Sequence, residues 1–439
     1  MTCLHWFSPL PPAATGIADY TASLVPLLQE ENRLVIWTDQ KEWDPSFERY
    51  APVRRFEGQT LQWTDLQREA PGIDHAAVFH IGNNGAFHKD IWEVSRRLPG
   101  TSVLHDTRLQ HLFAHIMRDC YQDRDLYLSV MSKYYGAYGA KAAESFWAGG
   151  RSTEEMAERF PLAAFAAEPN FSSVVHSEES LTLLDKEGCR SATYIPFPYA
   201  ARQEEPIRDP GPPFRITVCG YLGPNRRIES LLKALAGFPL RDKFRLEIYG
   251  RVWDPVYIKG LIQETGLQQF VTLQGFKPTV QDLDVALRGA HLGVNLRFPT
   301  MGEASMIQLR LWDHGIPSMV TPVGWYADLP RDTVVFVRPD NEIEDIRCHL
   351  HSFLEYPDRF AQMGDRARVA LKELHDPRIY VRQLLEFISL TRRFAARKAV
   401  LATAARVGSE LGAWLPARSL DDMRSRVSGE LRSFVDQHA

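Results

Sequence analysis

The segment 294–329 has the clearest chemical content, because polar side chains gather there at one predicted strand–helix junction. An apolar strand is predicted over 292–296, and a helix is predicted to open within 300–305 with Glu303 in its first turn. Ligands of open α/β sheets bind at the carboxyl ends of strands, beside helix N-termini that favour anions. The pattern therefore indicates a ligand site. Its candidate residues are Asn295, Arg297, Thr300, Met301, Gly302, Glu303 and Ser305.

A second junction, 219–228, would bring positive charge to the same kind of position. Gly220 opens the turn, and Arg226 and Arg227 come just before a helix predicted over Ile228–Ala236. Guanidinium groups beside a helix N-terminus suit a pyrophosphate, because bidentate hydrogen bonds add to the favourable helix dipole. The alternative interpretation is that both arginines face solvent.

Polar residues in the first half of the chain could face the same cleft. Gly16 precedes a helix predicted over 20–28, where a glycine lets backbone N–H groups approach a phosphate or a sugar. Two predicted strands end in polar clusters, which contain His80 with Asn83 and His105 with Asp106. A histidine there can bind a sugar hydroxyl, and Asp106 could orient the imidazole of His105. Purely structural roles for these histidines and for Gly16 remain open.

The elements that must position these residues form a repeating pattern. Short apolar runs, each followed by a longer helical pattern, occur at 33–38, 76–80, 102–105, 173–176, 214–220, 245–250, 271–275, 292–296 and 317–321. Strands that alternate with helices predict parallel sheets in a doubly wound α/β architecture. A chain of 439 residues exceeds one ordinary core, so two domains are expected.

The domain boundaries follow from composition. Segment 202–213 is rich in charge and proline and is predicted to be a linker. We predict two Rossmann-like domains, 1–201 and 214–380, that meet at a cleft. Residues 106–165 show no strand pattern and are predicted to form a helical insertion in the N-terminal domain. A helical tail is predicted over 381–439, with a basic group that could face solvent or a membrane surface: Arg392, Arg393, Arg397 and Lys398.

Composition narrows the class of protein. The hydrophobic fraction of 44% and the charged fraction of 24% are typical of a soluble globular protein, and a net charge of −4 gives no general attraction to nucleic acid. No apolar run approaches the ~20 residues that span a bilayer. With no signal-peptide pattern at the start, we expect a cytoplasmic protein, with the inner face of the membrane as an alternative location. Five dispersed cysteines predict reduced thiols and no structural zinc.

The sequence resembles retaining glycosyltransferases of the GT-B fold, the family-4-like group that uses nucleotide sugars. The residues that carry this resemblance lie in segments 8–20, 80–84, 105–111, 219–228 and 294–330. The resemblance covers most of residues 1–375. It implies two Rossmann-like domains facing a cleft and transfer of a sugar from a nucleotide-diphosphate sugar to an acceptor hydroxyl. It also implies retention of configuration, with no cofactor and no metal. The acceptor would be a glycan or a lipid-linked acceptor in cell-surface polysaccharide or glycoconjugate synthesis.

The resemblance also implies roles for single residues. His105 and Glu303 would orient the donor sugar, and Arg226 would stabilise charge on the leaving phosphate. His80, Asn83 and Asp106 would lie on the acceptor side. The remaining donor-binding residues would be Gly16, Gly220, Arg227, Asn295, Arg297, Thr300, Met301, Gly302 and Ser305, together with Phe276 and Lys277 beside the nucleotide base.

The chain departs from the family pattern at three positions. Thr15 stands where relatives carry the first of two glycines, and Tyr221 stands where they carry an arginine. The place of the second glutamate of the family's paired-glutamate motif holds Arg310, so the usual ribose contact is not expected. Two other functions therefore stay open. One is a non-catalytic scaffold or nucleotide-sugar-binding protein, and the other is a GT-B-like sugar epimerase.

Overall fold

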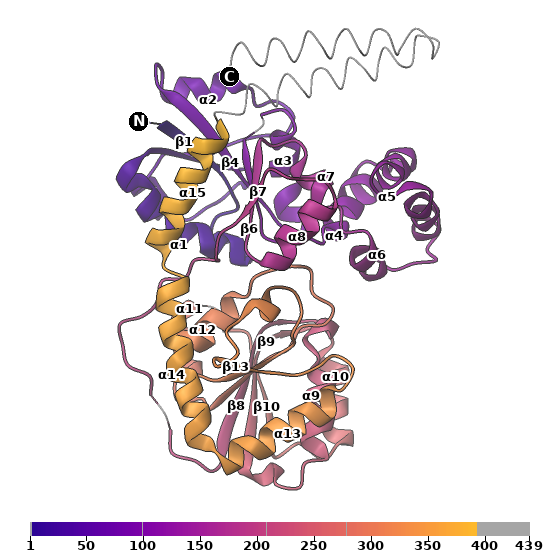
Figure 1. Ribbon diagram of the computed structural model, residues 1–439, viewed down its shortest axis with the longest axis vertical. Coiled ribbons are helices and arrows are strands. Elements are labelled where there is room, and N and C mark those ends of the chain that lie inside the picture. Colours follow the sequence, from indigo (N-terminus) through magenta and orange to yellow (C-terminus); the bar gives the residue numbers. More distant parts are fainter. Residues whose placement is uncertain (1, 99, 208, 278, 393–439) are drawn as a thin grey trace.

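The computed structural model describes residues 2–98, 100–207, 209–277 and 279–392 and shows two α/β domains, one above the other (Figure 1). The basic residues Arg393, Arg397 and Lys398 of the predicted tail lie outside the described residues. Membrane contact through the tail therefore stays a prediction. Within the described part of the chain, no helix has both the length and the apolar character needed to cross a membrane.

The N-terminal domain is built on a seven-stranded parallel sheet with strand order β3-β2-β1-β4-β5-β6-β7. Its strands are β1 (Thr2–Phe7), β2 (Arg33–Thr38), β3 (Val53–Arg55), β4 (Asp74–Ile81), β5 (Thr101–Leu104), β6 (Ser172–Val175) and β7 (Ala192–Tyr194). Its helices outside the insertion are α1 (Gly16–Glu31), α2 (Trp63–Glu69), α3 (Gly85–Ser95) and α8 (Glu178–Lys186). Four of these strands were predicted from apolar runs, whereas β1, β3 and β7 were not.

The C-terminal domain has a six-stranded parallel sheet with strand order β10-β9-β8-β11-β12-β13. Its strands are β8 (Phe214–Leu222), β9 (Phe244–Val252), β10 (Val271–Gly275), β11 (Leu292–Asn295), β12 (Ser318–Val320) and β13 (Val334–Phe336). Its helices are α9 (Ile228–Ala236), α10 (Pro255–Glu264), α11 (Val280–Leu287), α12 (Met306–Asp313), α13 (Glu342–Glu355) and α14 (Pro357–Leu374). The structure thus confirms the predicted class of two parallel-sheet domains.

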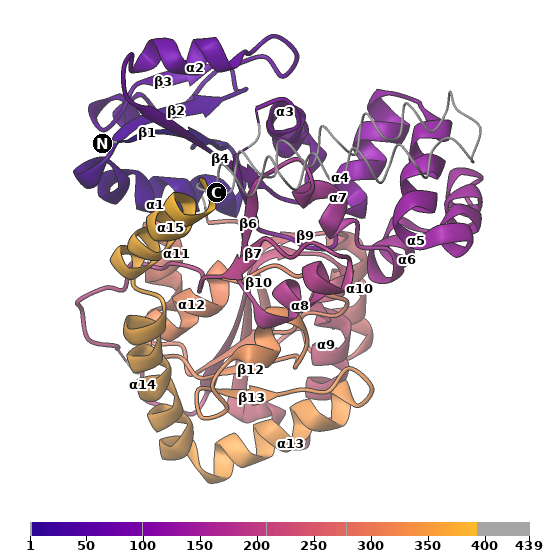
Figure 2. The same cartoon turned by 45° about the horizontal axis from the view of Figure 1, so that its top comes forward.

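The predicted helical insertion is confirmed and projects from one side of the N-terminal domain (Figure 2). It consists of α4 (Gln110–Ala114), a π-helical turn (His115–Cys120), α5 (Arg124–Trp147), α6 (Thr153–Arg159) and α7 (Ala163–Ala167). Gln110 fixes the first of these helices to the others. Its amide Nε2 donates to the carbonyl of Phe160 at 2.7 Å, and its Oε1 accepts from the hydroxyl of Tyr127 at 2.8 Å. All three residues are buried, so these hydrogen bonds fix the helices of the insertion relative to one another.

The chain returns to the N-terminal domain through its last described helix, α15 (Pro377–Arg392), drawn in yellow in Figure 1. This helix packs against α1, and the hydroxyl groups of Tyr20 and Tyr380 are hydrogen-bonded to each other. A buried apolar cluster continues from the first sheet to Trp312 and Trp325 of the second domain. The first part of the predicted tail therefore packs back over the domains and helps to join them.

Candidate active site

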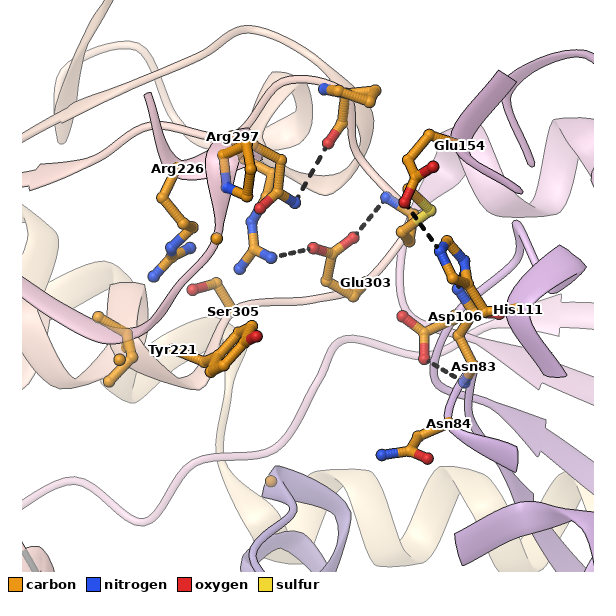
Figure 3. A pocket seen from close by; sticks show the side chains of 18 of the residues that line it. Asn83, Asn84, Asp106, His111, Glu154, Tyr221, Arg226, Arg297, Glu303 and Ser305 are labelled. Carbon is orange, nitrogen blue, oxygen red and sulfur yellow. Dashed lines mark hydrogen bonds and ion pairs between the residues drawn. The ribbon is translucent and has the colours of Figure 1, made fainter. Parts of the chain in front are cut away.

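A cleft of about 1020 Å³ lies between the two domains (Figure 3). The N-terminal wall consists of Gly16, Asn83, Asn84, Gly85, Ala86, Asp106, His111, His115 and Glu154. The C-terminal wall consists of Gly220, Tyr221, Gly223, Pro224, Asn225, Arg226, Arg227, Arg297, Phe298, Pro299, Met301, Glu303, Ala304, Ser305, Met306 and Ile307. Both walls are built largely from segments that follow the carboxyl ends of parallel strands, where α/β proteins bind ligands.

Arg226 is a buried cation on the C-terminal wall, only 5% exposed. It ends a short 3₁₀ turn after β8, and its Nη2 donates to the carbonyl of Cys219 at 2.9 Å. Its Nη1 has no hydrogen-bond partner among the residues that the structure describes. Burial and the nearby charge of Arg297 lower its pKa to about 10, with Tyr326 and Glu303 opposing that shift. A buried donor of this kind is costly unless a ligand satisfies it.

Arg297 lies beside Arg226 and is anchored by Glu303 (Figure 3). Its Nη1 is 2.6 Å from Glu303 Oε1. Burial disfavours the charged form of Arg297, but Glu303 and Tyr326 outweigh this and the pKa of Arg297 is raised. The wall therefore holds two neighbouring guanidinium groups, of which one is neutralised by a carboxylate and the other is not.

The prediction that Glu303 lies in the first turn of a helix is wrong. Helix α12 begins at Met306, after Ser305, whose Oγ accepts from the backbone N–H of Gln308 at 3.2 Å. Glu303 instead folds back, and its Oε2 accepts from the N–H of Met301 at 2.8 Å and from Thr300 Oγ1 at 3.1 Å. These bonds, with Arg297, hold the carboxylate in a turn rather than on the helix.

The turn at 300–305 also explains why position 302 is a glycine. Its φ is +83°, a conformation that favours glycine, and a Cβ there would lie 2.1 Å from Thr107 Oγ1 of the other domain. The backbone N–H groups of Thr107 and Arg108 donate to the carbonyl of Met301 at 3.0 and 2.9 Å. Gly302 therefore lets the 300–305 turn pack closely against the N-terminal domain.

Several predicted donor-site residues have other contacts. Asn295 is buried behind the cleft, where its Nδ2 donates to Ser305 Oγ and Gln308 Oε1, both at 3.1 Å. Arg227 lines the cleft, but its Nε is 2.7 Å from Glu342 Oε1. Phe276 and Lys277 follow β10 and are not among the residues that line the cleft. Their proposed contact with the nucleotide base stays a prediction.

Of the three glycines predicted to contact a ligand, Gly16 and Gly220 lie in the cleft walls, whereas Gly302 is not among the lining residues. Gly16 is the first residue of α1, which therefore begins four residues before the helix predicted over 20–28. The reason is Thr15, whose side chain caps the helix by accepting from the N–H of Ile17. A Cβ at Gly16 would meet no atom within 4 Å, so the wall is open at this point. Gly220, with φ of +113°, lies next to the Arg226 guanidinium.

Asp106 points into the cleft from the N-terminal wall, across from Glu303 (Figure 3). Its Oδ2 accepts from the backbone N–H of Asn83 at 2.8 Å. Burial and the negative charge of Glu303 raise its pKa to about 7, although the Asn83 bond and Arg297 oppose the change. Asp106 is therefore a carboxyl group that can change its charge near neutral pH.

The histidines predicted to face the cleft lie behind its wall. His80 and His105 are buried, and His80 Nδ1 is 3.0 Å from His105 Nε2. Burial lowers the pKa of both well below the usual value, so both are neutral. The prediction that Asp106 orients His105 is wrong. Successive side chains at the end of β5 point to opposite sides, so His105 faces His80 while Asp106 turns into the cleft.

The sequence analysis missed four polar residues of the N-terminal wall: Asn84, His111, His115 and Glu154. His111 and His115 are four residues apart, the spacing of one helix face, which was the available signal. Glu154 comes from α6, 43 residues further along the chain than His111. Only the folded insertion brings it to the cleft, so no local pattern could identify it.

A cluster of three potential metal ligands lies near the amino ends of β1 and β4, at the end of these strands that points away from the cleft. Across the described part of the chain, Cys3, His5 and His75 alone offer three candidate ligand atoms close together. However, the indole N–H of Trp37 donates to His5 Nδ1 at 3.0 Å. The proton of His5 must then be on Nε2, which donates to His75 Nδ1 at 2.9 Å. These hydrogen bonds already use the imidazole lone pairs that a metal would need.

Two parallel α/β domains with a ligand-binding cleft between them define the GT-B architecture, and similar solved structures confirm this fold. Sucrose-phosphate synthase from Thermosynechococcus elongatus matches with a TM-score of 0.61 and 16% identity, over 90% of this chain and 100% of that chain. HepE from Anabaena, in complex with UDP and glucose, matches with a TM-score of 0.57 and 14% identity, over 89% and 99%.

A third similar structure is WaaG, a glycosyltransferase involved in lipopolysaccharide biosynthesis. It matches with a TM-score of 0.53 and 13% identity, over 88% of this chain and 99% of that chain. No model of a protein family and no curated protein matches the sequence. The likeness to solved structures therefore establishes the fold of this chain, and its activity must be argued from the cleft.

Proposed function

We propose that the protein is a glycosyltransferase that moves a sugar from a nucleotide-diphosphate sugar to an acceptor hydroxyl. The observation that carries the proposal is the pair of guanidinium groups on the C-terminal wall, Arg226 and Arg297, with one buried N–H of Arg226 unpaired among the described residues. A diphosphate would supply both the hydrogen-bond acceptor and the counter-charge that this pair needs. Structures of HepE with UDP and with UDP-glucose support this choice of ligand.

In the proposed reaction, the bond between the anomeric carbon and the diphosphate oxygen breaks, and a bond from the acceptor oxygen to that carbon forms. The acceptor proton passes to the leaving diphosphate, so atoms and charge balance without a protein base. Arg226 stabilises the negative charge that develops on the diphosphate. The N-terminus of α12 adds to this effect, because Met306 and Ile307 of its first turn line the cleft.

Glu303 and His105 have different tasks in this proposal. Glu303 is held by Arg297, Thr300 and the Met301 N–H, so its carboxylate can accept hydrogen bonds from donor-sugar hydroxyl groups in one orientation. His105 is a positioning residue, since its buried ring contacts His80 rather than the cleft. Retention of configuration, independence of metal and a role in cell-surface glycan synthesis follow from the sequence resemblance and belong to the same proposal.

The direct test incubates the purified protein with UDP-, GDP-, ADP- and dTDP-sugars and a set of glycoside acceptors, and measures products by mass spectrometry. We expect one donor class to lose its sugar to an acceptor, and Glu303→Gln to lower the rate by roughly tenfold or more. Glu355→Gln, an exposed substitution on α13, should have no effect. Conversion of the donor to another nucleotide sugar without acceptor would instead indicate an epimerase. No consumption of any donor would overturn the proposal and favour a scaffold.

A further inference from the structure

The N-terminal wall of the cleft differs chemically from the wall that faces it. Its polar side chains are two carboxylates, Asp106 and Glu154, with two asparagines and two histidines. None of the described residues on this wall is a lysine or an arginine. The three arginines that line the cleft, Arg226, Arg227 and Arg297, all belong to the C-terminal wall. Figure 3 shows the two groups on opposite sides, with Glu303 between them.

The hydrogen bonds of the N-terminal wall define the direction of each donor. Asn83 Oδ1 accepts from the backbone N–H of Leu112 at 3.3 Å, so its Nδ2 faces His111 Nδ1 at 3.2 Å. Because Asn83 Nδ2 is a donor, His111 Nδ1 must accept, and neutral His111 carries its proton on Nε2. Nε2 then donates to Glu154 Oε1 at 3.4 Å, a long hydrogen bond. The hydrogen bond between His111 and Glu154 thus has a defined direction but is weak.

Two carboxylate positions remain able to accept hydrogen bonds from a ligand. Glu154 is 61% exposed at its side chain and lies at the start of α6. Asp106 uses Oδ2 for the Asn83 N–H, and no bond to its Oδ1 occurs within the described chain. Carboxylates accept hydrogen bonds from hydroxyl groups, whereas they repel a phosphate. The wall therefore suits a partner rich in hydroxyl groups and without negative charge.

We propose that the N-terminal wall binds the sugar ring of an uncharged acceptor, whose hydroxyl groups donate to Asp106 and Glu154, and that it rejects a phosphate at this position. The inference rests on the proposed function and names the substrate class of its second substrate. The helical insertion supplies Glu154 and His111, and the buried Gln110 bonds to Phe160 and Tyr127 keep α4 and α6 in place. The insertion is thus a specificity element for the acceptor.

The test measures binding of methyl glucoside, methyl galactoside, methyl mannoside and methyl N-acetylglucosaminide to the UDP-loaded full chain by saturation-transfer NMR. The corresponding sugar 6-phosphates are measured in parallel. We expect at least one neutral glycoside to bind more tightly than its phosphate. Glu154→Gln should weaken that binding by roughly tenfold, the effect of losing a hydrogen bond to a charged group. Glu158→Gln, an exposed substitution on the same helix, should leave it unchanged.

Charge reversal makes the test sharper. In Glu154→Lys, the preference should shift by roughly tenfold or more toward the phosphorylated sugars. The inference is overturned if no neutral glycoside binds, if the wild type prefers the phosphates, or if Glu154→Lys leaves the preference unchanged. The rise in melting temperature caused by UDP, GDP, ADP and dTDP is measured for every variant. If none of the four stabilises any variant, the proposed function fails; if one of them stabilises all variants equally, a failed glycoside test overturns only the acceptor inference.

Discussion

The two walls of the cleft differ in the charge of their ionisable side chains, which include three arginines on the C-terminal wall and two carboxylates on the N-terminal wall. On the C-terminal wall, burial and the nearby charge of Arg297 lower the pKa of Arg226. On the N-terminal wall, burial and the negative charge of Glu303 raise the pKa of Asp106. In both cases an ionisable side chain is held where its charged form is disfavoured in the free protein. Such positions are typical of groups that meet their partner only in a complex.

The difference between the walls assigns one substrate to each. A cationic wall stabilises a diphosphate in the ground state and still more as charge develops on it during transfer. A wall with two carboxylates and no lysine or arginine among its described lining residues can bind hydroxyl groups, whereas its carboxylates repel a phosphate. The cleft therefore separates an anionic donor from a neutral acceptor by electrostatics, and the following predictions test that separation.

The largest expected effect concerns the residues behind the N-terminal wall. Burial lowers the pKa of His80 and His105 well below the usual value and that of His88 and His176 to about 4. Because the unfolded chain binds protons near pH 6.5, stability is fully present above 6.5 and is lost as the pH falls toward 4. At about 1.4 kcal/mol per unit of pKa, the free energy of unfolding should fall by several kcal/mol.

Calorimetry from pH 7 to pH 4 measures this loss, and hydrogen exchange locates it. Amides of the N-terminal sheet should lose protection first, because the four histidines lie in that domain. A melting temperature that is constant from pH 7 to 4.5, or earlier loss of protection in the C-terminal sheet, would contradict the account of the histidine cluster.

The second prediction removes the charge of the C-terminal wall. Arg226→Met keeps most of the side-chain volume but cannot stabilise the leaving diphosphate, so kcat/KM for transfer should fall by about 100-fold. The melting temperature of the free protein should stay the same or rise, because burial and Arg297 disfavour the charge. Arg359→Met, an exposed substitution on α14, is the control. Equal activity of the two variants would contradict the claim that Arg226 stabilises the leaving diphosphate.

The third prediction concerns Asp106 and is read from a pH profile. If its carboxylate accepts a hydrogen bond from the acceptor, kcat/KM for the acceptor should rise by about tenfold through pH 7. Glu303→Gln removes one of the two causes that raise the pKa of Asp106, the other being burial, so the inflection should move to lower pH. Asp106→Asn should abolish it. Since burial of the charged form costs stability above pH 7, Asp106→Asn should also be more stable than wild type at pH 8 and lose that advantage toward pH 4.

The smallest expected effect concerns Tyr221, whose side chain is 73% exposed on the C-terminal wall. An exposed aromatic ring in a cleft can stack on a nucleotide base or a sugar, a contact worth about 1 kcal/mol. Tyr221→Ala should therefore weaken UDP binding by roughly fivefold in calorimetric titration. Tyr138→Ala, which removes an exposed ring from α5, should not change it. Identical affinities for the two variants would exclude a stacking role.

Most of the sheet structure could be predicted because buried parallel strands are continuous apolar runs. The predicted runs at 33–38 and 271–275 coincide with β2 and β10. The strands β3, β7 and β13 were missed because each is a three-residue strand at the edge of a sheet, and in β3 only Val53 is buried. Such short edge segments join a sheet through backbone hydrogen bonds to a neighbour, which side-chain patterning does not reveal.

The candidate site was predictable where it follows strand ends, and this is why Arg226, Arg297, Glu303 and Asp106 were found. Placement in a cleft wall was harder to predict than proximity to a strand end. His105 and Asn295 have the right sequence position, but strand alternation and the start of α12 turn both side chains into the interior. Glu154 could not be found, because it reaches the cleft only through the packing of the insertion.

The most direct test of the central claim is calorimetric titration of the wild type and Arg226→Met with UDP, GDP, ADP and dTDP. The account predicts that one diphosphate binds the wild type selectively, that Arg226→Met weakens this binding by roughly tenfold or more, and that Arg359→Met binds like the wild type. Binding of none of the four diphosphates, or equal affinity in wild type and Arg226→Met, would contradict the claim that the C-terminal wall holds a nucleotide-diphosphate donor.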